Sequence, residues 1–458
     1  MSDFIPPFPK RHKDDISPFK ALYYAQKDLL SIWSEKTFGL QFMHRKIFKQ
    51  NVFIANSPDT IRYVFVENKD NYERKSPQMR RALEPLLGDG LFISDGDTWS
   101  SRRKIQTPLF DSKHIKMFTD TMISTIAEMT DDWKNKMDRG NVSEIDVHPE
   151  MGKLTAEIIA RTLFGEKLGS ENSSAVVEAF AKYQSVVKQT NLANFLGLPD
   201  WLPNMNGKMG KGRRAAKVIH DAVDDIITKA EESGDEGTLV AEFLKANQGE
   251  SGVDLMTKKQ IRNELIVLFM AGHETTANVL AWTWYLISQA PGVEKKLHDE
   301  LDQVLSGRIP TMADVESLKY TRAILDETMR LYPPVPILSR EAATEDKIRG
   351  KKVPAGSIML IVPWLIHRHK TYWDKPDHFI PERFMPDAAK PIKFSYIPFS
   401  AGPRVCLGKN FGIVESVLTI AMIAQRFRLS MPQGTKVEHE CRLTLRPKGR
   451  LPMKVDAI

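Results

Sequence analysis

The chain has 458 residues, of which 42% are hydrophobic and 27% are charged, and this ordinary globular composition excludes long disordered or low-complexity segments. Its 65 Lys and Arg residues against 58 Asp and Glu residues give a net charge of +7, but no zinc-finger or RNA-binding signature accompanies that charge, so we expect no nucleic acid partner. The two cysteines, Cys406 and Cys441, are too few for a disulfide framework, which favours a reducing compartment and a cytoplasmic location.

The first half of the chain is predicted to be mostly helical. The N-terminal residues include no apolar stretch long enough for a signal peptide or a membrane anchor. A short strand is predicted at Asn51–Ala55, and helical patterns follow at Ser112–Met137 and Met151–Leu163. The apolar segment Leu265–Ala290 carries charged and polar residues near its middle, which are costly in lipid. We therefore predict a long helix buried inside the protein rather than a membrane span.

The second half adds more helices and a few strands. Three helices are predicted from apolar residues at helical spacing, namely Val293–Leu305, Ser317–Leu331 and the stretch that begins at Gly408. Strands are predicted at Ile358–Val362, after a turn, and as a pair within Leu443–Val455. The Pro-rich and aromatic segment 376–403 is interpreted as an ordered loop. No linker separates these parts, so we expect a single domain over residues 1–458.

The segment Phe399–Gly408 has the sequence FSAGPRVCLG and contains Cys406. A lone cysteine is most often a buried structural residue. A catalytic thiol would need a histidine partner, and no protease-type cysteine signature surrounds this one. A zinc site would need more cysteines or closely spaced histidines. The fourth interpretation is a thiolate ligand of haem iron.

The chemistry around Cys406 favours haem. Glycines at 402 and 408 let the backbone approach closely, and backbone N–H groups with the following helix N-terminus stabilise negative charge on the sulfur. Arg404 is expected to meet a carboxylate on the rim of the cofactor. Phe399 is expected to shield the sulfur from water.

This segment resembles the cysteine loop of the cytochromes P450, the haem-thiolate monooxygenases, which reads Phe, two residues, Gly, one residue, Arg, one residue, Cys, one residue, Gly. The resemblance implies a mainly α fold with a small β portion, in which haem b lies between a long central helix and the helix after the cysteine loop. It implies that Cys406 is the iron ligand, and that the reaction is insertion of one oxygen atom of O₂ into an organic substrate.

Other landmarks of the family follow in order along nearly the whole chain. Glu327 and Arg330 lie in ETMR, three residues apart on one helix face, and Arg383 lies in PERF. Such a pair is usually a solvated surface pair worth under roughly 1 kcal/mol. The family's pattern implies instead a buried triad that anchors the cysteine loop.

The segment AGHETT lies midway in the predicted long helix. It could be only a polar patch whose threonine hydroxyls bond back to the preceding turn. The resemblance places it on the oxygen side of the haem, where Gly272 leaves room for dioxygen. Glu274 is then the acid that relays protons inward, and Thr275 is the alcohol that hands them on.

Further residues are assigned by the resemblance to the rim of the haem and to its substrate. Trp99 and Arg103, in W-x-x-x-R, and Arg340 would meet the haem propionates, with Arg74 as a weaker candidate. The run GDGLF resembles a loop over the haem in bacterial fatty-acid hydroxylases of the family. Four residues are therefore expected to line the substrate pocket, namely Phe92, Ala271, Val335 and Leu338.

No flavin module and no cysteine set for an iron–sulfur cluster is recognisable in the chain, so we expect NAD(P)H electrons to arrive through a separate reductase with a ferredoxin or flavodoxin. An acidic carrier would use the positive charge, through residues expected on the thiolate side, namely Arg102, Lys104, Lys113, Lys116 and Lys409; scattered solvated cations are the alternative. We expect a monomer that acts on a moderately sized apolar substrate, with access segments at 74–92, 183–209 and 335–338. The other function classes are a peroxide-using or rearranging enzyme of the same fold and a helical binding protein without cofactor.

Overall fold

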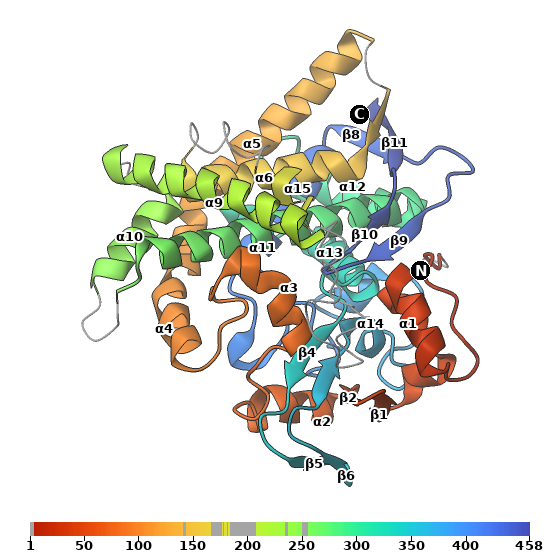
Figure 1. Cartoon of the computed structure of the whole chain (residues 1–458). Helices are drawn as coiled ribbons and strands as arrows, with labels where there is room; N and C mark the ends of the chain where they lie inside the picture. The colour runs from red at the N-terminus through yellow and green to blue at the C-terminus, as the bar shows by residue number, and fades with distance from the viewer. Residues whose placement is uncertain are drawn as a thin grey trace.

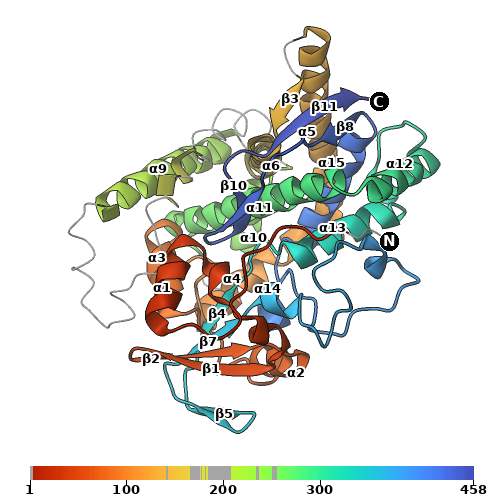
Figure 2. The same cartoon turned by 90° about the vertical axis from the view of Figure 1, so that its right-hand side faces the viewer.

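The computed structural model describes residues 4–140, 143–165, 176, 178–180, 182–183, 208–233, 237–249 and 255–458. Helices make up most of it, and they surround one central helix (Figures 1 and 2). The helices of the described residues are α1 Pro18–Lys27, α2 Pro58–Arg62, α3 Pro77–Leu87, α4 Gly96–Gln106, α5 Ser112–Asp138, α6 Val147–Phe164, α9 Lys208–Ser233, α10 Leu239–Gly249, α11 Lys258–Ser288, α12 Pro291–Leu305, α13 Lys319–Leu331, α14 Pro363–Ile366 and α15 Lys409–Ala424.

The strands form small sheets at the edges of the helical body. They are β1 Phe42–Ile47, β2 Gln50–Ala55, β3 Glu144–Asp146, β4 Leu338–Glu341, β5 Asp346–Ile348, β6 Lys351–Val353, β7 Ile358–Ile361, β8 Phe427–Ser430, β9 Glu438–Cys441, β10 Leu445–Lys448 and β11 Pro452–Ala457. The largest sheet has the order β1-β2-β7-β4, with β2 and β7 parallel and the other pairs antiparallel. It lies at the lower end of the molecule in Figure 1.

Helix α11 is the central element. Thr257 caps its N-terminus in a capping box with Gln260, and its 31 residues correspond to about 46 Å of helix. Its side chains are buried almost all round, which is the pattern of a helix inside a large domain. No helix of the described residues is long and apolar enough to cross a membrane. The prediction of a buried long helix is therefore confirmed, with its end at Ser288 rather than at Ala290.

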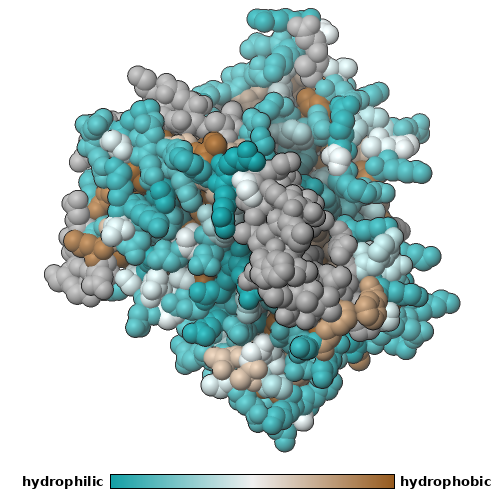
Figure 3. Space-filling model, viewed as in Figure 1, coloured by the Kyte–Doolittle hydropathy of each residue, from teal (hydrophilic) through white to brown (hydrophobic). Residues whose placement is uncertain are grey.

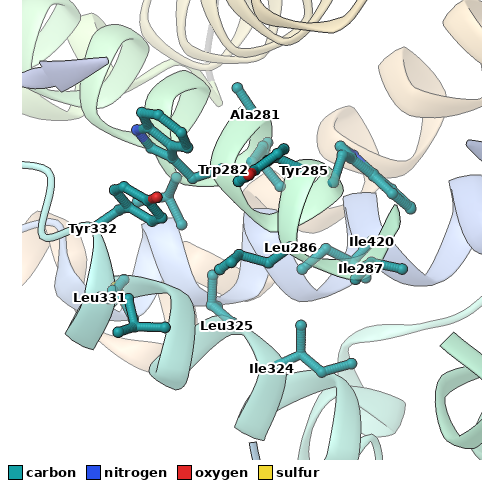
Figure 4. Close-up of a cluster of buried hydrophobic side chains, with 14 of the residues drawn as sticks. Ala281, Trp282, Tyr285, Leu286, Ile287, Ile324, Leu325, Leu331, Tyr332 and Ile420 are labelled. Carbon is teal, nitrogen blue, oxygen red and sulfur yellow. The ribbon is translucent and has the colours of Figure 1, made fainter. Parts of the chain in front are cut away.

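The main hydrophobic core joins α11 to α13 and α15. Figure 4 shows side chains from these helices converging, and the rings of Trp282 and Tyr332 stack at 3.9 Å between centroids. Leu286, Leu325 and Ile420 are each at most 1% exposed there. Burial of such side chains stabilises the fold by about 1.5–3 kcal/mol each, so this core fixes α11 against the helix that follows Cys406. On the face seen in Figure 3, by contrast, most residues are hydrophilic.

The predicted elements mostly agree with the structure and differ at their ends. Helix α6 begins at Val147, four residues before the predicted start, and α13 begins two residues after it, at Lys319. The predicted pair of strands within Leu443–Val455 is wrong as a pair, because β10 pairs with β9 whereas β11 pairs with β3 and β8. Pairing depends on contacts that periodicity does not encode.

Candidate active site

The cysteine loop approaches the segment 63–67 very closely. Gly402 has φ of +70°, and a Cβ at that position would lie 2.2 Å from the backbone oxygen of Phe65, so only glycine fits. The loop is closed by the backbone N–H of Cys406, which donates to the carbonyl of Phe399 at 2.9 Å. Gly408 is different: its φ is −81°, and no protein atom lies within 4 Å of a Cβ built there. The expectation that both glycines permit close approach therefore holds for Gly402 and is wrong for Gly408 as regards protein neighbours.

Cys406 is exposed although it lies just before the buried helix α15. The protein atoms around its sulfur desolvate the thiol and raise its pKa, against the lowering effect of the Gly408 backbone N–H and of the charges of Arg103 and Lys409. The Gly408 N–H and the two cations favour the thiolate, as the sequence suggests, but they do not outweigh desolvation. A coordinated metal ion would, because it deprotonates a thiol outright.

The middle of α11 is open on one side. Every residue from Asn263 to Ile287 is buried except Ala271, Gly272 and Thr275. Ala271 and Thr275 are one turn apart on the same face, and the Thr275 hydroxyl donates to the Ala271 carbonyl at 2.6 Å. A flat cofactor in contact with Ala271 and with Cys406 would account for two exposed groups in otherwise buried elements. The Cys406 thiol, as a ligand for iron, and the open face of α11 thus fit haem.

Glu274 lies next to Thr275 but is buried, and its Oε1 accepts a hydrogen bond from the Thr444 hydroxyl at 2.7 Å. The two residues expected to act in sequence therefore differ in burial and in hydrogen-bond partner. Gly272 has a packing role that the sequence did not predict: a Cβ there would lie 3.0 Å from two side-chain carbons of Ile159 on α6. The missing side chain lets α6 and α11 approach each other, and the expectation that it also leaves room for dioxygen stays a prediction.

Three cations gather beside the cysteine loop. Arg340 is 2% exposed and Lys75 is 7% exposed. Burial, followed by the charge of Arg404, lowers the pKa of Arg340 to about 9, and burial with both arginines holds the pKa of Lys75 well below its usual range. Arg404 pairs with Glu73 at 3.1 Å, whereas Lys75 has no acidic partner within 4.0 Å among the described residues. Buried cations in excess over carboxylates call for an anionic ligand, and two propionates fit.

The predicted partners of those propionates converge at the same place, with one correction. The Arg404 guanidinium lies over the ring of Trp99 at 4.5 Å, and both residues line a pocket of about 210 Å³ with Arg340. Arg103 is half-buried near Cys406, where burial lowers the pKa of its guanidinium. Arg74 is wrong as a candidate, because it is exposed and lies 3.4 Å from Asp95. The buried cation is Lys75, the next residue, which sequence reasoning missed.

Of the five cations predicted to form a positive surface for a partner protein, one is buried. Lys104, Lys113, Lys116 and Lys409 are exposed. Arg102 is buried and bound to Glu264 of α11 at 2.6 Å and to Asp89 at 2.5 Å, so it cannot contact a partner protein. Glu264 also accepts from the backbone N–H of Leu91, which fixes the loop that carries Phe92.

Glu327, Arg330 and Arg383 come together as the sequence predicts. The Glu327 carboxylate lies 2.6 Å from Arg330 Nε and 3.5 Å from Arg383 Nε, and Glu327 and Arg330 are fully buried. Arg330 also donates to the carbonyls of His367, Pro376 and His378, and Glu327 accepts from Ile380 N. The cluster thus anchors the segment 367–380, which leads into the cysteine loop, rather than the loop directly.

An apolar pocket of about 160 Å³ lies between α1, the four-stranded sheet and the β9–β10 hairpin. Its walls include Leu29, Ile47, Met79, Ile337 and Leu443. The predicted pocket residues Val335 and Leu338 do not line it, although their neighbours Pro336 and Ile337 do. Phe92 packs partly against the core, and the Lys75 ammonium lies 4.6 Å from its ring centre. Of the predicted access segment 183–209, residues 184–207 lie outside the described residues.

The comparisons with known proteins agree on one family. The family model described as "Cytochrome P450" matches residues 28–453. A curated relative, "Cyclooctatin synthase" of Streptomyces melanosporofaciens, is 30% identical over 437 residues, which are 93% of this chain and 90% of that protein. "Carotene epsilon-monooxygenase, chloroplastic" of Arabidopsis thaliana is 29% identical over 426 residues, 89% of this chain and 78% of that protein. The solved structure "Crystal structure of cytochrome P450DA heme domain" shares the fold with a TM-score of 0.82 at 22% identity, covering 99% of this chain and 98% of that one.

Proposed function

Because this chain belongs to the cytochrome P450 family and is a haem-thiolate monooxygenase of that family, we propose that it hydroxylates an extended apolar substrate with electrons from a separate acidic carrier. The balanced reaction is R–H + O₂ + 2 e⁻ + 2 H⁺ → R–OH + H₂O. When bound, haem b supplies the oxygen chemistry of this reaction. We place the enzyme in the cytoplasm as a monomer.

In this proposal Cys406 is the axial ligand of the iron. Lys75, Trp99, Arg103, Arg340 and Arg404 hold the haem carboxylates. The excess of buried positive charge at Lys75 and Arg340 is the observation that carries this assignment, since those cations need an anion that the described protein residues do not provide. Phe399 shields the sulfur from water, as the family pattern implies.

Protons reach the oxygen side through Glu274 and Thr275. The Thr275 hydroxyl lies on the open face of α11 and is held by the Ala271 carbonyl. In this position the hydroxyl gives its one hydrogen to the carbonyl and keeps lone pairs free to accept a proton; to pass a proton on it rotates away from the carbonyl, whereas an alanine could do neither. The carboxyl of Glu274, one residue away, is the group that supplies it.

The substrate class follows from the apolar pocket and from the relatives. The pocket beside the β9–β10 hairpin has apolar walls from three parts of the chain, with Arg442 as its charged lining residue. Two relatives are named for carotene and for cyclooctat-9-en-7-ol, a hydrocarbon and an alcohol with a hydrocarbon skeleton. Such molecules gain most of their affinity from burial of apolar surface.

The electron carrier is proposed to dock on the exposed lysines 104, 113, 116 and 409. An acidic ferredoxin or flavodoxin would complement them, and such steering weakens steeply as salt screens the charges. The rate of electron transfer to the haem should therefore fall with ionic strength, and more slowly in a Lys113→Gln/Lys116→Gln variant. A rate without salt dependence would rule out this docking surface.

A Thr275→Ala variant tests the proposed reaction. Alanine keeps the helix, and haem content should not change. The ratio of product formed to NAD(P)H consumed should fall several-fold, with more hydrogen peroxide released, whereas turnover driven by added peroxide should fall less. Thr283→Ala is the matched control, since that buried hydroxyl donates only to the Val279 carbonyl of the same helix in the described structure. An unchanged ratio in Thr275→Ala, or turnover with peroxide alone, would favour the peroxide-using alternative.

A further inference from the structure

The turn of the β9–β10 hairpin reaches the middle of α11, although the two are far apart in the chain. Strand β10 packs beside α11 (Figure 2). Thr444, in the turn between the two strands, is 3% exposed and donates its hydroxyl hydrogen to Glu274 Oε1 at 2.7 Å, across 170 residues. A hydroxyl that donates to a carboxylate at this distance makes a charge-assisted hydrogen bond, which is stronger than one between neutral groups.

The backbone around Thr444 is fixed independently of that bond. Leu445 N donates to the Pro334 carbonyl at 2.9 Å, and the indole N–H of Trp282, on α11 itself, donates to the Leu445 carbonyl at 3.2 Å. Arg442 N donates to the Thr444 carbonyl at 3.0 Å and closes the turn. The hydroxyl therefore stands at a set place relative to α11, rather than following Glu274.

The terminal torsion of a glutamate side chain is broad, so the carboxyl takes its orientation from the groups that bind it. A donor on a rigid turn restricts that torsion. The bond links Glu274 to the hairpin side of α11, while Thr275 occupies the open face of the helix. One of the contacts that orient the carboxyl thus comes from a residue outside α11.

We propose that Thr444 is a positioning residue: it fixes the Glu274 carboxyl on the hairpin side of α11, and the relay to Thr275 starts from this held position. This inference rests on the relay role proposed above for Glu274. It assigns no proton transfer to Thr444 itself. The hydroxyl acts through Glu274, so its effect requires the carboxyl to be present.

The test uses the holoenzyme with a plant-type ferredoxin, its reductase, NADPH and lauric acid as an apolar probe. The variants are Thr444→Val, which keeps the shape and removes the hydroxyl, Thr444→Ser, which keeps the hydroxyl, Glu274→Gln and the double variant Thr444→Val/Glu274→Gln. Thr283→Val is the control for loss of a buried hydroxyl on α11. Two quantities are measured: hydrogen peroxide released per NADPH consumed, and the infrared carboxylate band of Glu274, identified as the band lost in Glu274→Gln.

We expect Thr444→Val to raise peroxide release several-fold and to shift the Glu274 band, and Thr444→Ser to restore both. The double variant should resemble Glu274→Gln alone, and Thr283→Val should resemble the parent. If Glu274→Gln raises peroxide release but Thr444→Val changes neither quantity, the inference is wrong and the relay role stands. If Glu274→Gln itself behaves as the parent, the relay role fails and the inference with it. Equal effects of Thr444→Val, Thr444→Ser and Thr283→Val would also overturn the inference, because they would reflect packing.

Discussion

A Glu327→Ala variant should lose most of the stability of the segment that leads to the cysteine loop. Arg330 is fully buried, and its guanidinium has five acceptor contacts: two with Glu327 and one each with the carbonyls of His367, Pro376 and His378. Alanine removes two of these and leaves the buried positive charge of Arg330 without its carboxylate partner. Breaking a buried ion pair in this way costs about 3–5 kcal/mol.

The expected change in melting temperature follows from the size of the chain. With an unfolding entropy of about 2.1 cal/mol/K per residue, 458 residues give about 1 kcal/mol/K, so the loss corresponds to about 3–5 °C. The assay is thermal unfolding followed by circular dichroism, with haem content measured by absorbance. Arg383→Ala should cost less stability, because Arg383 lies 3.5 Å from Glu327, farther than the 2.6 Å of Arg330.

The control is Asp299→Ala, which breaks the exposed pair between Lys295 and Asp299 on α12, with side chains 76% and 59% exposed. Exposed pairs of this spacing contribute about 0.3–0.5 kcal/mol, so the melting temperature should hardly change. A Glu327→Ala variant as stable as Asp299→Ala, with normal haem content, would refute the reasoning about the buried cluster.

Two further predictions concern other buried charges. Lys75→Met removes a buried cation that has no acidic partner among the described residues, so it should raise the melting temperature of the apoprotein. The same variant should retain haem less well, measured by transfer of haem to apomyoglobin. A variant that retains haem as well as the parent would exclude Lys75 from the propionate site. Burial lowers the pKa of His273 to about 4 and of His367 to about 3 from the ordinary 6.5, so the unfolded chain binds these protons first and the free energy of unfolding should fall as pH drops from 6.5 to 4. His273→Gln should flatten that slope in urea titrations, and an equal slope in both proteins would contradict the burial argument.

The sequence predicted what short motifs encode. The cysteine loop, the ETMR pair and the mid-helix segment are each only a few residues long, so the spacing within each motif determines how its residues lie relative to one another. Helix ends shifted by up to seven residues, as at the start of α11, since proline and capping residues allow several starting points. The four-stranded sheet with its parallel pair was not predicted, because pairing joins segments some 300 residues apart.

Sequence reasoning missed residues whose role depends on where the side chain points, which the spacing of residues along the chain does not show. Arg102 and Arg103 are neighbours on α4, but about 100° separates successive side chains on a helix, so one is buried against Glu264 and the other faces Cys406. Arg74 and Lys75 are also neighbours, in the loop before α3, and only Lys75 is buried. Thr444 is brought to Glu274 only by the tertiary fold, and its own sequence neighbourhood shows no sign of that contact.

The most direct test of the account is the absorbance of the reduced protein with carbon monoxide, in the parent and in two serine variants. Cys441 is buried in β9, away from the cysteine loop, and Cys406 is the exposed thiol before α15. We predict that the parent and Cys441→Ser absorb at the position diagnostic of thiolate ligation, and that Cys406→Ser loses this band. A Cys406→Ser protein with the parental band would contradict the assignment of Cys406 as the iron ligand.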